Sequence, residues 1–330
     1  MIDVAIAGQA ILAEGPLWDA RRGELLWVDI AAGTVNTYRP EDGATRRIEL
    51  GEDLGCVALT PDSGTVIGAL RSGWYWVDLE DGTKERIAPL PDGAANQRFN
   101  DGAVDAAGRF LTGTLEDGEE RPVGRLFQLD SDLRYRVLDS GFLCSNGLAW
   151  SLDNRWLYFV DSRRDTIFRY PYDVETGRVG ERELFLDTTP YHGIPDGIEI
   201  DLDGLLWCAF WDGAQVIAFD DAGTPCVELP VPAPRPTSIA FGGTDLCTLF
   251  VTSASYGLPA EMLADWPHAG SVFRIERPTP GRPSNVFGGV SELRSPGGAP
   301  WWRPPTMASD GRSRSVSSVI TGGLPRVGYE

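Results

Sequence analysis

The feature that most constrains the fold is a pattern that recurs six times along the chain. Each copy has a leading residue, a small residue, a short apolar strand, a turn rich in Asp, Asn or Gly, and a second apolar strand. The copies begin at Glu14, Gly55, Asp101, Asn146, Asp196 and Thr237, which are 41 to 50 residues apart. Small sheets repeated at this period bury their faces only against neighbouring copies, as in a β-propeller.

The sequence therefore predicts an all-β fold, a six-bladed β-propeller, over residues 1–289. The 39 Gly and 24 Pro among 330 residues agree with many short strands and turns. The WD and kelch signatures are missing from the copies, so we expect a propeller of another type. The early segment "DVAIAG" is a candidate to complete the last blade and close the ring.

Composition excludes several classes of partner. The formal net charge of −19 repels nucleic acid and anionic lipid. Because the sequence has no run of about 18 apolar residues and starts without a basic, apolar leader, we expect a cytoplasmic protein that does not bind membranes. We expect a monomer or a weak homo-oligomer.

Cysteine and histidine are too sparse for a zinc site built from them. The five cysteines are scattered without a CxxC pair, which predicts buried free thiols rather than a disulfide framework. With two histidines, the chain cannot form a multi-histidine zinc site. Ser145 does not lie in a GxSxG elbow, so a Ser-His-Asp hydrolase is not expected either.

The leading residues of the copies are candidates for a metal centre on the propeller axis. If the copies superpose, these residues begin the innermost strands and their side chains converge. Glu14, Asn146 and Asp196 are strong oxygen ligands, and Asp101 is a fourth candidate. Carboxylates brought together there repel one another unless a cation lies between them. We therefore expect one divalent ion, which is Ca²⁺, Zn²⁺, Mn²⁺, Mg²⁺ or Fe²⁺.

Four motifs in fixed order resemble those of the SMP-30/gluconolactonase/regucalcin family of six-bladed propellers. They are "EGPLW", "RFNDGAVDAAGRFLTGTL", "SNGLAWSLDNRWLYFVDS" and "IPDGIEIDLDGLLW", and the similarity extends from about residue 11 to residue 289. The resemblance implies that Glu14, Asn146 and Asp196 hold the metal ion. It also implies that Arg98 and Asn100 contact the substrate.

An acidic residue that follows "GTL" should also bind substrate by this resemblance. The stretch reads "GTLEDGEERPVG", in which Glu116, Glu119 and Glu120 all fit, and Glu116 is the weakly preferred candidate. Among the aromatic residues, Trp211 and Tyr191 are the two candidates for a sugar platform. His192 is placed on a loop at the channel mouth, where we expect exposure rather than a substrate contact.

An incomplete shell of two carboxylates and an amide suits hydrolysis of a cyclic ester. Such a shell leaves room for water and substrate, and a bound divalent ion activates both. We expect a metal-dependent lactonase that opens sugar lactones to aldonic acids, with Asp196 as both ligand and general base. The alternatives are a related calcium-dependent esterase or phosphotriesterase, and a non-enzymatic calcium-binding propeller.

The segment 290–330 differs from the rest of the chain. It is basic, lacks strand periodicity and follows the end of the family resemblance, which favours a disordered or irregular tail.

Removal of residues 290–330 is therefore expected to leave lactone hydrolysis and the melting temperature unchanged. A thermal melt and a lactonase assay on the truncated and full-length chains test this expectation. A clear fall in either quantity would show that the segment stabilises or completes the propeller.

Overall fold

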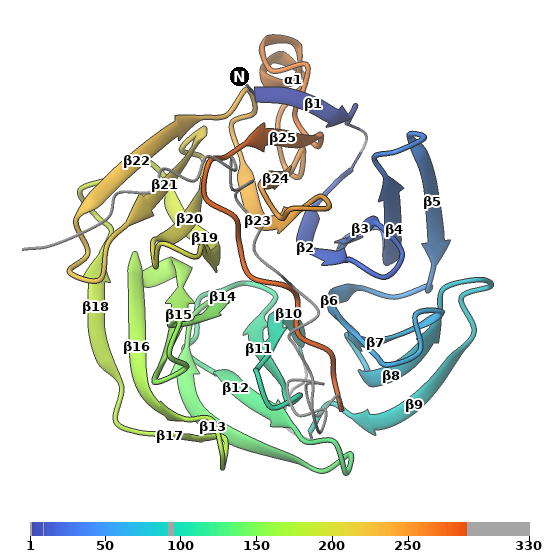
Figure 1. The fold of residues 1–330 in the computed structure, drawn as a ribbon, viewed down its shortest axis with the longest axis vertical. Coiled ribbons are helices and arrows are strands. Elements are labelled where there is room, and N and C mark those ends of the chain that lie inside the picture. Colours follow the sequence, from blue (N-terminus) through green and yellow to red (C-terminus); the bar gives the residue numbers. More distant parts are fainter. Residues whose placement is uncertain (1, 9, 92–95, 289–330) are drawn as a thin grey trace, which may run out of the picture. The chain divides into compact units, whose positions relative to one another are not determined.

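A computed structural model describes residues 2–8, 10–91 and 96–288 of the chain. Within these ranges the strands form six antiparallel sheets around a common axis (Figure 1). The prediction of an all-β, six-bladed propeller is confirmed. The segment 290–330 lies outside the described residues, so its expected disorder stays a prediction.

Each blade is one sheet, and we number the blades in chain order. Blade 1 contains β2 (Ala13–Asp19), β3 (Glu24–Asp29), β4 (Thr34–Arg39) and β5 (Ala44–Glu49), and blade 2 contains β6 (Leu54–Leu59), β7 (Thr65–Leu70), β8 (Gly73–Asp78) and β9 (Lys84–Pro89). Blade 3 contains β10 (Gln97–Val104), β11 (Phe110–Glu116), β12 (Gly124–Leu129) and β13 (Tyr135–Phe142).

The second half of the ring follows the same plan. Blade 4 contains β14 (Ser145–Trp150), β15 (Trp156–Asp161), β16 (Thr166–Asp173), β17 (Arg178–Val179) and β18 (Glu183–Asp187), with the 3-10 helix η1 (Ser162–Arg164) after β15. Blade 5 contains β19 (Ile194–Ile200), β20 (Leu206–Trp211), β21 (Gln215–Phe219) and β22 (Pro225–Pro230). Blade 6 contains β23 (Pro236–Gly242), β24 (Thr248–Ser253), β25 (Val272–Glu276) and β1 (Ile2–Ile6), with helix α1 (Ala260–Asp265) between β24 and β25.

The ring closes through the first strand of the chain. Strand β1 pairs antiparallel with β25, where Ile2 lies opposite Ile275 and Asp3 opposite Arg274. The expectation that "DVAIAG" completes the last blade is therefore confirmed. This pairing makes β1 the outermost strand of blade 6, and Ala5 and Ile6 pack against the apolar cluster that joins blades 6 and 1.

The apolar core is divided among the interfaces between adjacent blades. Six buried clusters occur among the described residues, and each takes its side chains from two neighbouring blades. Between blades 2 and 3, for example, the ring of Trp74 lies 4.5 Å from that of Phe99. The innermost strands β6, β14 and β23 are buried at every residue, whereas the outermost strand β5 is almost fully exposed. Burial thus decreases from the axis outward, as expected for sheets that pack face to face.

Glycines beside the leading residues let the inner strands approach one another closely. A Cβ atom on Gly147 would lie 2.5 Å from the backbone nitrogen of Ile198, on the next inner strand. A Cβ atom on Gly197 would lie 2.7 Å from the Cα atom of Ser238. Only glycine fits at such contacts. Close packing of the inner strands, and not a turn, therefore explains the Asn-Gly and Asp-Gly pairs of the repeat.

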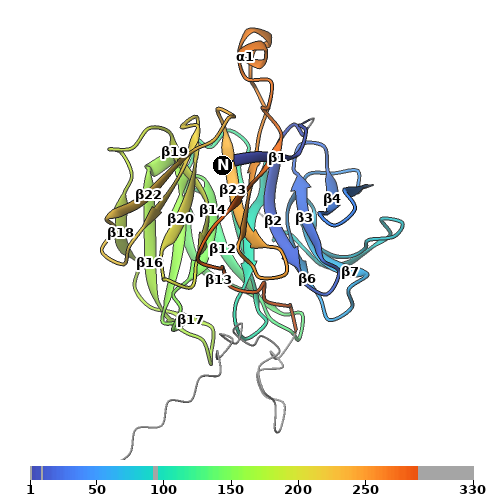
Figure 2. The same ribbon diagram turned by 45° about the horizontal axis from the view of Figure 1, so that its top comes forward.

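Residues 277–288 form a strap across the end of the axis where the inner strands finish (Figure 1). Its backbone forms hydrogen bonds to four blades. The pairs are Gly281 with Leu246 of blade 6, Pro280 with Leu202 of blade 5, Phe287 with Leu59 of blade 2, and Gly288 with Gly108 of blade 3. The loop that carries α1 lies at the opposite end, since Ala254 bridges Leu12 just before β2. Figure 2 shows α1 standing clear of the sheets at that end.

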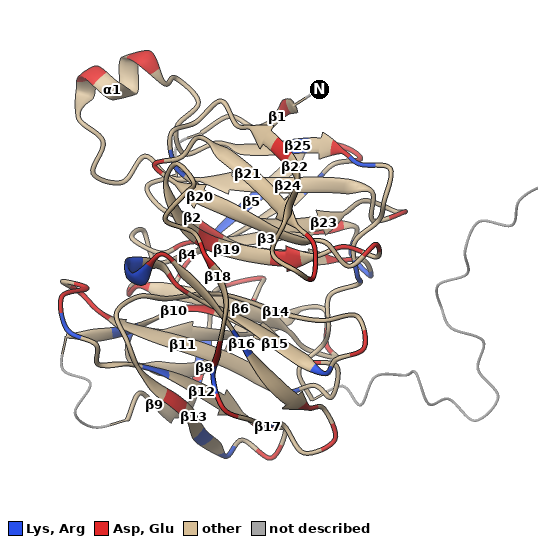
Figure 3. Ribbon diagram, turned by 90° about the vertical axis from the view of Figure 1, so that its left-hand side faces the viewer, with Lys and Arg blue, Asp and Glu red and all other residues tan. Residues whose placement is uncertain are grey.

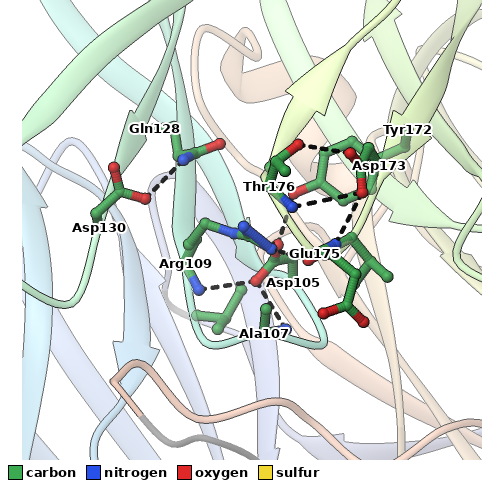
Figure 4. A network of polar contacts seen from close by, with 12 residues as sticks. Asp105, Ala107, Arg109, Gln128, Asp130, Tyr172, Asp173, Glu175 and Thr176 are labelled. Atoms are coloured by element: carbon green, nitrogen blue, oxygen red, sulfur yellow. Dashed lines mark hydrogen bonds and ion pairs between the residues drawn. The ribbon is translucent and has the colours of Figure 1, made fainter.

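A buried polar network joins blades 3 and 4 (Figure 4). The carboxylate of Asp105 is fully buried and accepts hydrogen bonds from the Tyr172 hydroxyl at 2.6 Å and from Arg109 Nε at 2.8 Å. Asp105 also accepts from the backbone nitrogens of Ala107 and Arg109, which sets the turn between β10 and β11. One side chain therefore fixes a turn and links two blades.

The described residues also bear on the distribution of charge, on membrane-spanning helices and on the state of the cysteines. Asp and Glu residues occur on loops and strands throughout the described part of the ribbon (Figure 3). No helix in the described ranges is long and apolar enough to cross a membrane. All five cysteines are free thiols, but Cys226 is exposed and Cys247 is half-buried, so burial is confirmed only for Cys56, Cys144 and Cys208.

Replacing Asp105 by alanine is expected to lower the free energy of unfolding by about 3–5 kcal/mol, because Arg109 and Tyr172 lose their buried partner. The exposed Asp132 gives a matched control, and Asp132→Ala should change stability by less than about 0.5 kcal/mol. Urea unfolding of both variants measures the difference. Equal, small losses would contradict a stabilising role for the network.

Candidate active site

A cavity of about 450 Å³ opens where the inner strands begin, at the end opposite the strap. All six blades contribute to its lining. The lining residues are Leu12, Glu14, Ile30, Ala31, Asp53, Arg71, Arg98, Asn100, Asp117, Glu119, Cys144, Asn146, Ser162, Arg163, Ile194, Pro195, Asp196, Trp211 and Tyr256. The three predicted metal ligands, Glu14, Asn146 and Asp196, are all among them. The predicted substrate residues Arg98 and Asn100 are there as well.

Two buried carboxylates lie on the axis at the floor of this cavity. Glu14 is 5% exposed and Asp196 is 4% exposed. Burial and the neighbouring charge of Asp101 raise the pKa of Glu14 to about 8. Burial, followed by the charges of Glu14 and Asp101, raises the pKa of Asp196 well above its usual value. Both carboxylates are thus destabilised as anions in the protein alone.

Asp196 has a buried oxygen atom that is not satisfied by the protein. Among the described residues, Oδ1 of Asp196 has no hydrogen-bond partner. A buried oxygen in this state costs free energy unless a ligand or solvent contacts it. The atom therefore supports a bound cation or water at the floor of the cavity.

Asn146 is held between two side chains that orient its amide. Its Oδ1 accepts a hydrogen bond from Asn100 Nδ2 at 3.1 Å, and its Nδ2 donates to Ser162 Oγ at 3.0 Å. Asn100 in turn accepts from Arg98 Nη1 at 2.6 Å. A hydrogen-bonded chain thus runs from Arg98 to the amide of Asn146, and it fixes the direction of the amide oxygen.

The donor set fits a hard divalent ion. No three Asp, Glu, His or Cys side chains of the described ranges gather as a metal-binding group. Two carboxylates and the Asn146 amide oxygen are the oxygen donors that a hard divalent ion would use, and three protein ligands would leave positions for water and substrate. Ca²⁺, Mg²⁺ and Mn²⁺ prefer such oxygen ligands.

The strand pairing of blade 3 differs from the alignment of the repeats, which placed Asp101 at the position of Asn146 and Asp196. The ladders of blades 3, 4 and 5 are each interrupted at the same level, after Phe99, Ser145 and Pro195. Asn100, not Asp101, therefore matches Asn146 and Asp196. Asp101 is buried and lines a second cavity of about 110 Å³ on the strap side. Consecutive residues of a strand point to opposite sides, so only one of the pair reaches the larger cavity.

Glu116, the preferred acidic residue after "GTL", does not line the cavity. It ends β11 opposite Gln97 and forms an ion pair with Arg121, which lowers the pKa of Glu116. Glu119 lines the cavity instead and forms an ion pair with Arg163 on η1. Glu120 is exposed and is not among the lining residues.

Several lining residues were missed by sequence reasoning, although the repeat contains a signal for them. The residue that follows the second strand of a blade lines the cavity in four blades, as Ile30, Arg71, Asp117 and Ser162. Extending the copies by one position finds Ile30, Arg71 and Ser162, and extending the third copy by two positions finds Asp117. The rim also contains an ionic cluster, in which Arg71 contacts Asp53 at 2.6 Å and Asp117 at 2.8 Å.

The aromatic and histidine candidates separate clearly. Trp211 lines the cavity, whereas Tyr191 packs against Phe210 and Phe219 in the interface between blades 4 and 5. His192 is exposed and does not line the cavity.

Fold and cavity together define a six-bladed β-propeller with a polar, carboxylate-floored cavity at one end of its axis. Residues 12–255 match the family described as SMP-30/Gluconolactonase/LRE-like region. The chain therefore belongs to the SMP-30/gluconolactonase/LRE-like family, which confirms the resemblance seen in the motifs.

The chain aligns over most of its length with proteins that have a named activity or a solved structure. The chain is 40% identical to a 6-deoxy-6-sulfogluconolactonase from Pseudomonas putida, over 85% of this chain and 96% of that protein. It is 35% identical to a pentonolactonase from Haloferax volcanii, over 82% and 93% of the two chains. The crystal structure of the calcium-binding protein regucalcin from Agrobacterium tumefaciens superposes with a TM-score of 0.83 and 26% identity, over 86% of this chain and 96% of that one.

A divalent metal ion is expected to raise the melting temperature of the protein relative to the protein in EDTA. At about one hundred times its dissociation constant, an ion that binds only the folded state should add about 5 °C. Glu14→Gln and Asp196→Asn should each reduce this shift, because each variant loses a charged ligand. Differential scanning calorimetry with Ca²⁺, Mg²⁺ and Mn²⁺ in turn measures the shift.

Glu199→Gln is the matched control, since Glu199 lies three residues further along β19 and lines the cavity on the strap side. Its metal-dependent shift should equal that of the wild type. Loss of the shift in Glu199→Gln alone would place the ion at the strap end of the axis.

Proposed function

We propose that the protein is a metal-dependent lactonase that opens sugar lactones to aldonic acids. The observation that carries the proposal is the pair of buried carboxylates, Glu14 and Asp196, at the floor of a polar cavity, where Asp196 Oδ1 has no hydrogen-bond partner within the described part of the chain. Membership of a family that includes named lactonases supports the same reaction.

Glu14 and Asp196 would hold the ion through their carboxylates, and Asn146 would hold it through its amide oxygen. A bound divalent ion polarises an ester carbonyl and lowers the pKa of water beside it. Asn100 and Ser162 keep the amide of Asn146 in place through their hydrogen bonds. The site is thus held by side chains from blades 1, 3, 4 and 5.

Asp196 is proposed to remove a proton from the attacking water through its unpartnered Oδ1 atom. The oxygen of that water forms a bond to the lactone carbonyl carbon, and the bond from this carbon to the ring oxygen then breaks. The ring oxygen takes up a proton and becomes a hydroxyl of the aldonic acid. Water and lactone are the only reactants that the step requires.

Arg98 and Asn100 are proposed to bind hydroxyl or carbonyl oxygens of the lactone. Among the described residues, Arg98 forms no ion pair, so its guanidinium can donate to a neutral, oxygen-rich ligand. Glu119, rather than Glu116, is our proposed acidic contact because it lines the cavity. Asp117 lines it as well and offers a further acceptor for substrate hydroxyls.

A phosphotriesterase, another esterase or a binding protein without activity would use the same ion. The polar side chains that line blades 2, 3 and 4 favour a polyol over a neutral apolar ester, which offers few hydrogen-bond partners. A panel of aldonolactones, aryl esters and phosphotriesters, assayed with and without a chelator, separates these functions. Hydrolysis of lactones that the chelator abolishes is the expected result.

At saturating metal, Asp196→Asn is expected to lower kcat for lactone hydrolysis by about a hundredfold or more, since the variant keeps an oxygen but loses the base. Arg98→Ala should mainly raise KM, because a substrate anchor contributes to binding in both the ground state and the transition state. Steady-state kinetics corrected for spontaneous lactone opening measure both effects. Near wild-type kcat in metal-saturated Asp196→Asn would remove Asp196 from the role of base.

A further inference from the structure

The cavity is divided into a charged half and an apolar half. Apart from Glu14 and Asp196 on its floor, the charged lining residues all come from blades 2, 3 and 4. The lining residues of blades 5, 6 and 1 include Ile194, Trp211, Tyr256, Leu12, Ile30 and Ala31. Leu12 and Ile30 are buried in the core, so the accessible part of this side is formed by Ile194, Trp211, Tyr256 and Ala31, which we call the apolar wall.

The apolar wall is held in place by contacts outside the cavity. The guanidinium of Arg235 lies 4.7 Å from the ring centre of Trp211 and forms an ion pair with Asp212 at 2.6 Å. Arg235 also donates a hydrogen bond to the carbonyl oxygen of Tyr256. One arginine therefore joins blade 5 to the loop after β24, and it contacts the ring of Trp211 and the backbone of Tyr256. Preformed apolar surface binds a ligand without a cost for ordering it.

The cavity is larger than its polar half requires. Its volume of about 450 Å³ lies in the range of about 300–1,000 Å³ that is typical of sites for drug-sized molecules. A monosaccharide lactone is smaller than such a molecule, and its hydroxyls match the charged half. When the ester carbonyl lies over Asp196 and the hydroxyls face Arg98, the space beside Trp211 and Tyr256 is left for a group without hydrogen-bonding needs.

We propose that the preferred substrate is a sugar lactone that carries an apolar substituent, and that this substituent binds against the wall formed by Trp211, Tyr256 and Ala31. The inference rests on the proposed lactonase function and adds the substrate class to it. A polar substituent at the same position would exchange its hydrogen bonds to water for at most those of the Trp211 indole N–H and the Tyr256 hydroxyl.

The test compares kcat/KM for three lactones with the metal-loaded, full-length protein. They are gluconolactone, its 6-O-butyl ether, and a disaccharide lactone that carries a second sugar on the gluconolactone ring. We expect kcat/KM for the butyl ether to be at least about tenfold higher than for gluconolactone, as burial of the butyl chain predicts. The disaccharide lactone should show no such gain.

Ala31 gives a matched pair of variants, because it is exposed and lines the cavity. We call the ratio of kcat/KM for the butyl ether to kcat/KM for gluconolactone the butyl preference. Ala31→Glu places a charge on the wall and should lower this ratio to about 1, whereas Ala31→Leu should keep it. Tyr256→Ala, on the exposed loop, should lower the preference severalfold. The readout is the ratio of the two kcat/KM values, so a general loss of activity does not imitate the effect.

Failure of the inference differs from failure of the proposed function. If none of the lactones is hydrolysed in a metal-dependent reaction, the lactonase proposal is wrong. If gluconolactone is hydrolysed and the butyl ether is no better, or the disaccharide lactone is preferred, the apolar subsite is wrong and the lactonase proposal stands. A butyl preference that Ala31→Glu leaves unchanged would also overturn the placement of the subsite.

Discussion

A propeller blade cannot bury both faces of its own sheet, and the rest of this structure depends on that constraint. Each of the six apolar clusters takes side chains from two neighbouring blades, so every blade is stabilised from both sides only in a closed ring. Strand β1 meets this requirement at the junction by pairing with β25. The buried link from Asp105 to Tyr172 adds a polar contact between blades 3 and 4.

Closure of the ring brings the first residues of the inner strands together on the axis. The glycines that follow Asn146 and Asp196 permit backbone contacts that a Cβ atom would prevent. The same close approach buries Glu14 and Asp196 beside each other and raises the pKa of both carboxyl groups. A divalent ion at this point would offset the repulsion. The destabilising burial of two neighbouring carboxylates is therefore itself an argument that this site binds a cation.

The remaining lining of the cavity follows from which loops meet at its mouth. Cross-blade ion pairs hold the charged side, with Arg71 joining blades 2 and 3 and Arg163 joining blades 4 and 3. Arg235 holds the opposite, apolar side through Trp211 and the Tyr256 loop. The substrate contacts proposed for Arg98 and Asn100 thus come from blade 3, whereas the selectivity proposed for the wall comes from blades 5, 6 and 1.

The sequence by itself determined the number of blades and the strand that completes the last blade, because the repeat marks each blade. It also predicted that Glu14, Asn146 and Asp196 lie near one another where inner strands begin, and all three line one cavity. It could not decide between Asn100 and Asp101. Aligning the copies on the residue before Gly matches Asp101 to Asn146 and Asp196, whereas the interruption of the strand ladders at the same level in blades 3, 4 and 5 matches Asn100 to them. It also favoured Glu116 over Glu119, because the loop after β11 has no periodic pattern. Only the tertiary structure placed Glu119 in the cavity, through its ion pair with Arg163 from the next blade, and gathered an apolar wall from three blades far apart in sequence. Contacts between loops of different blades depend on how the ring closes, which no local pattern of residues encodes.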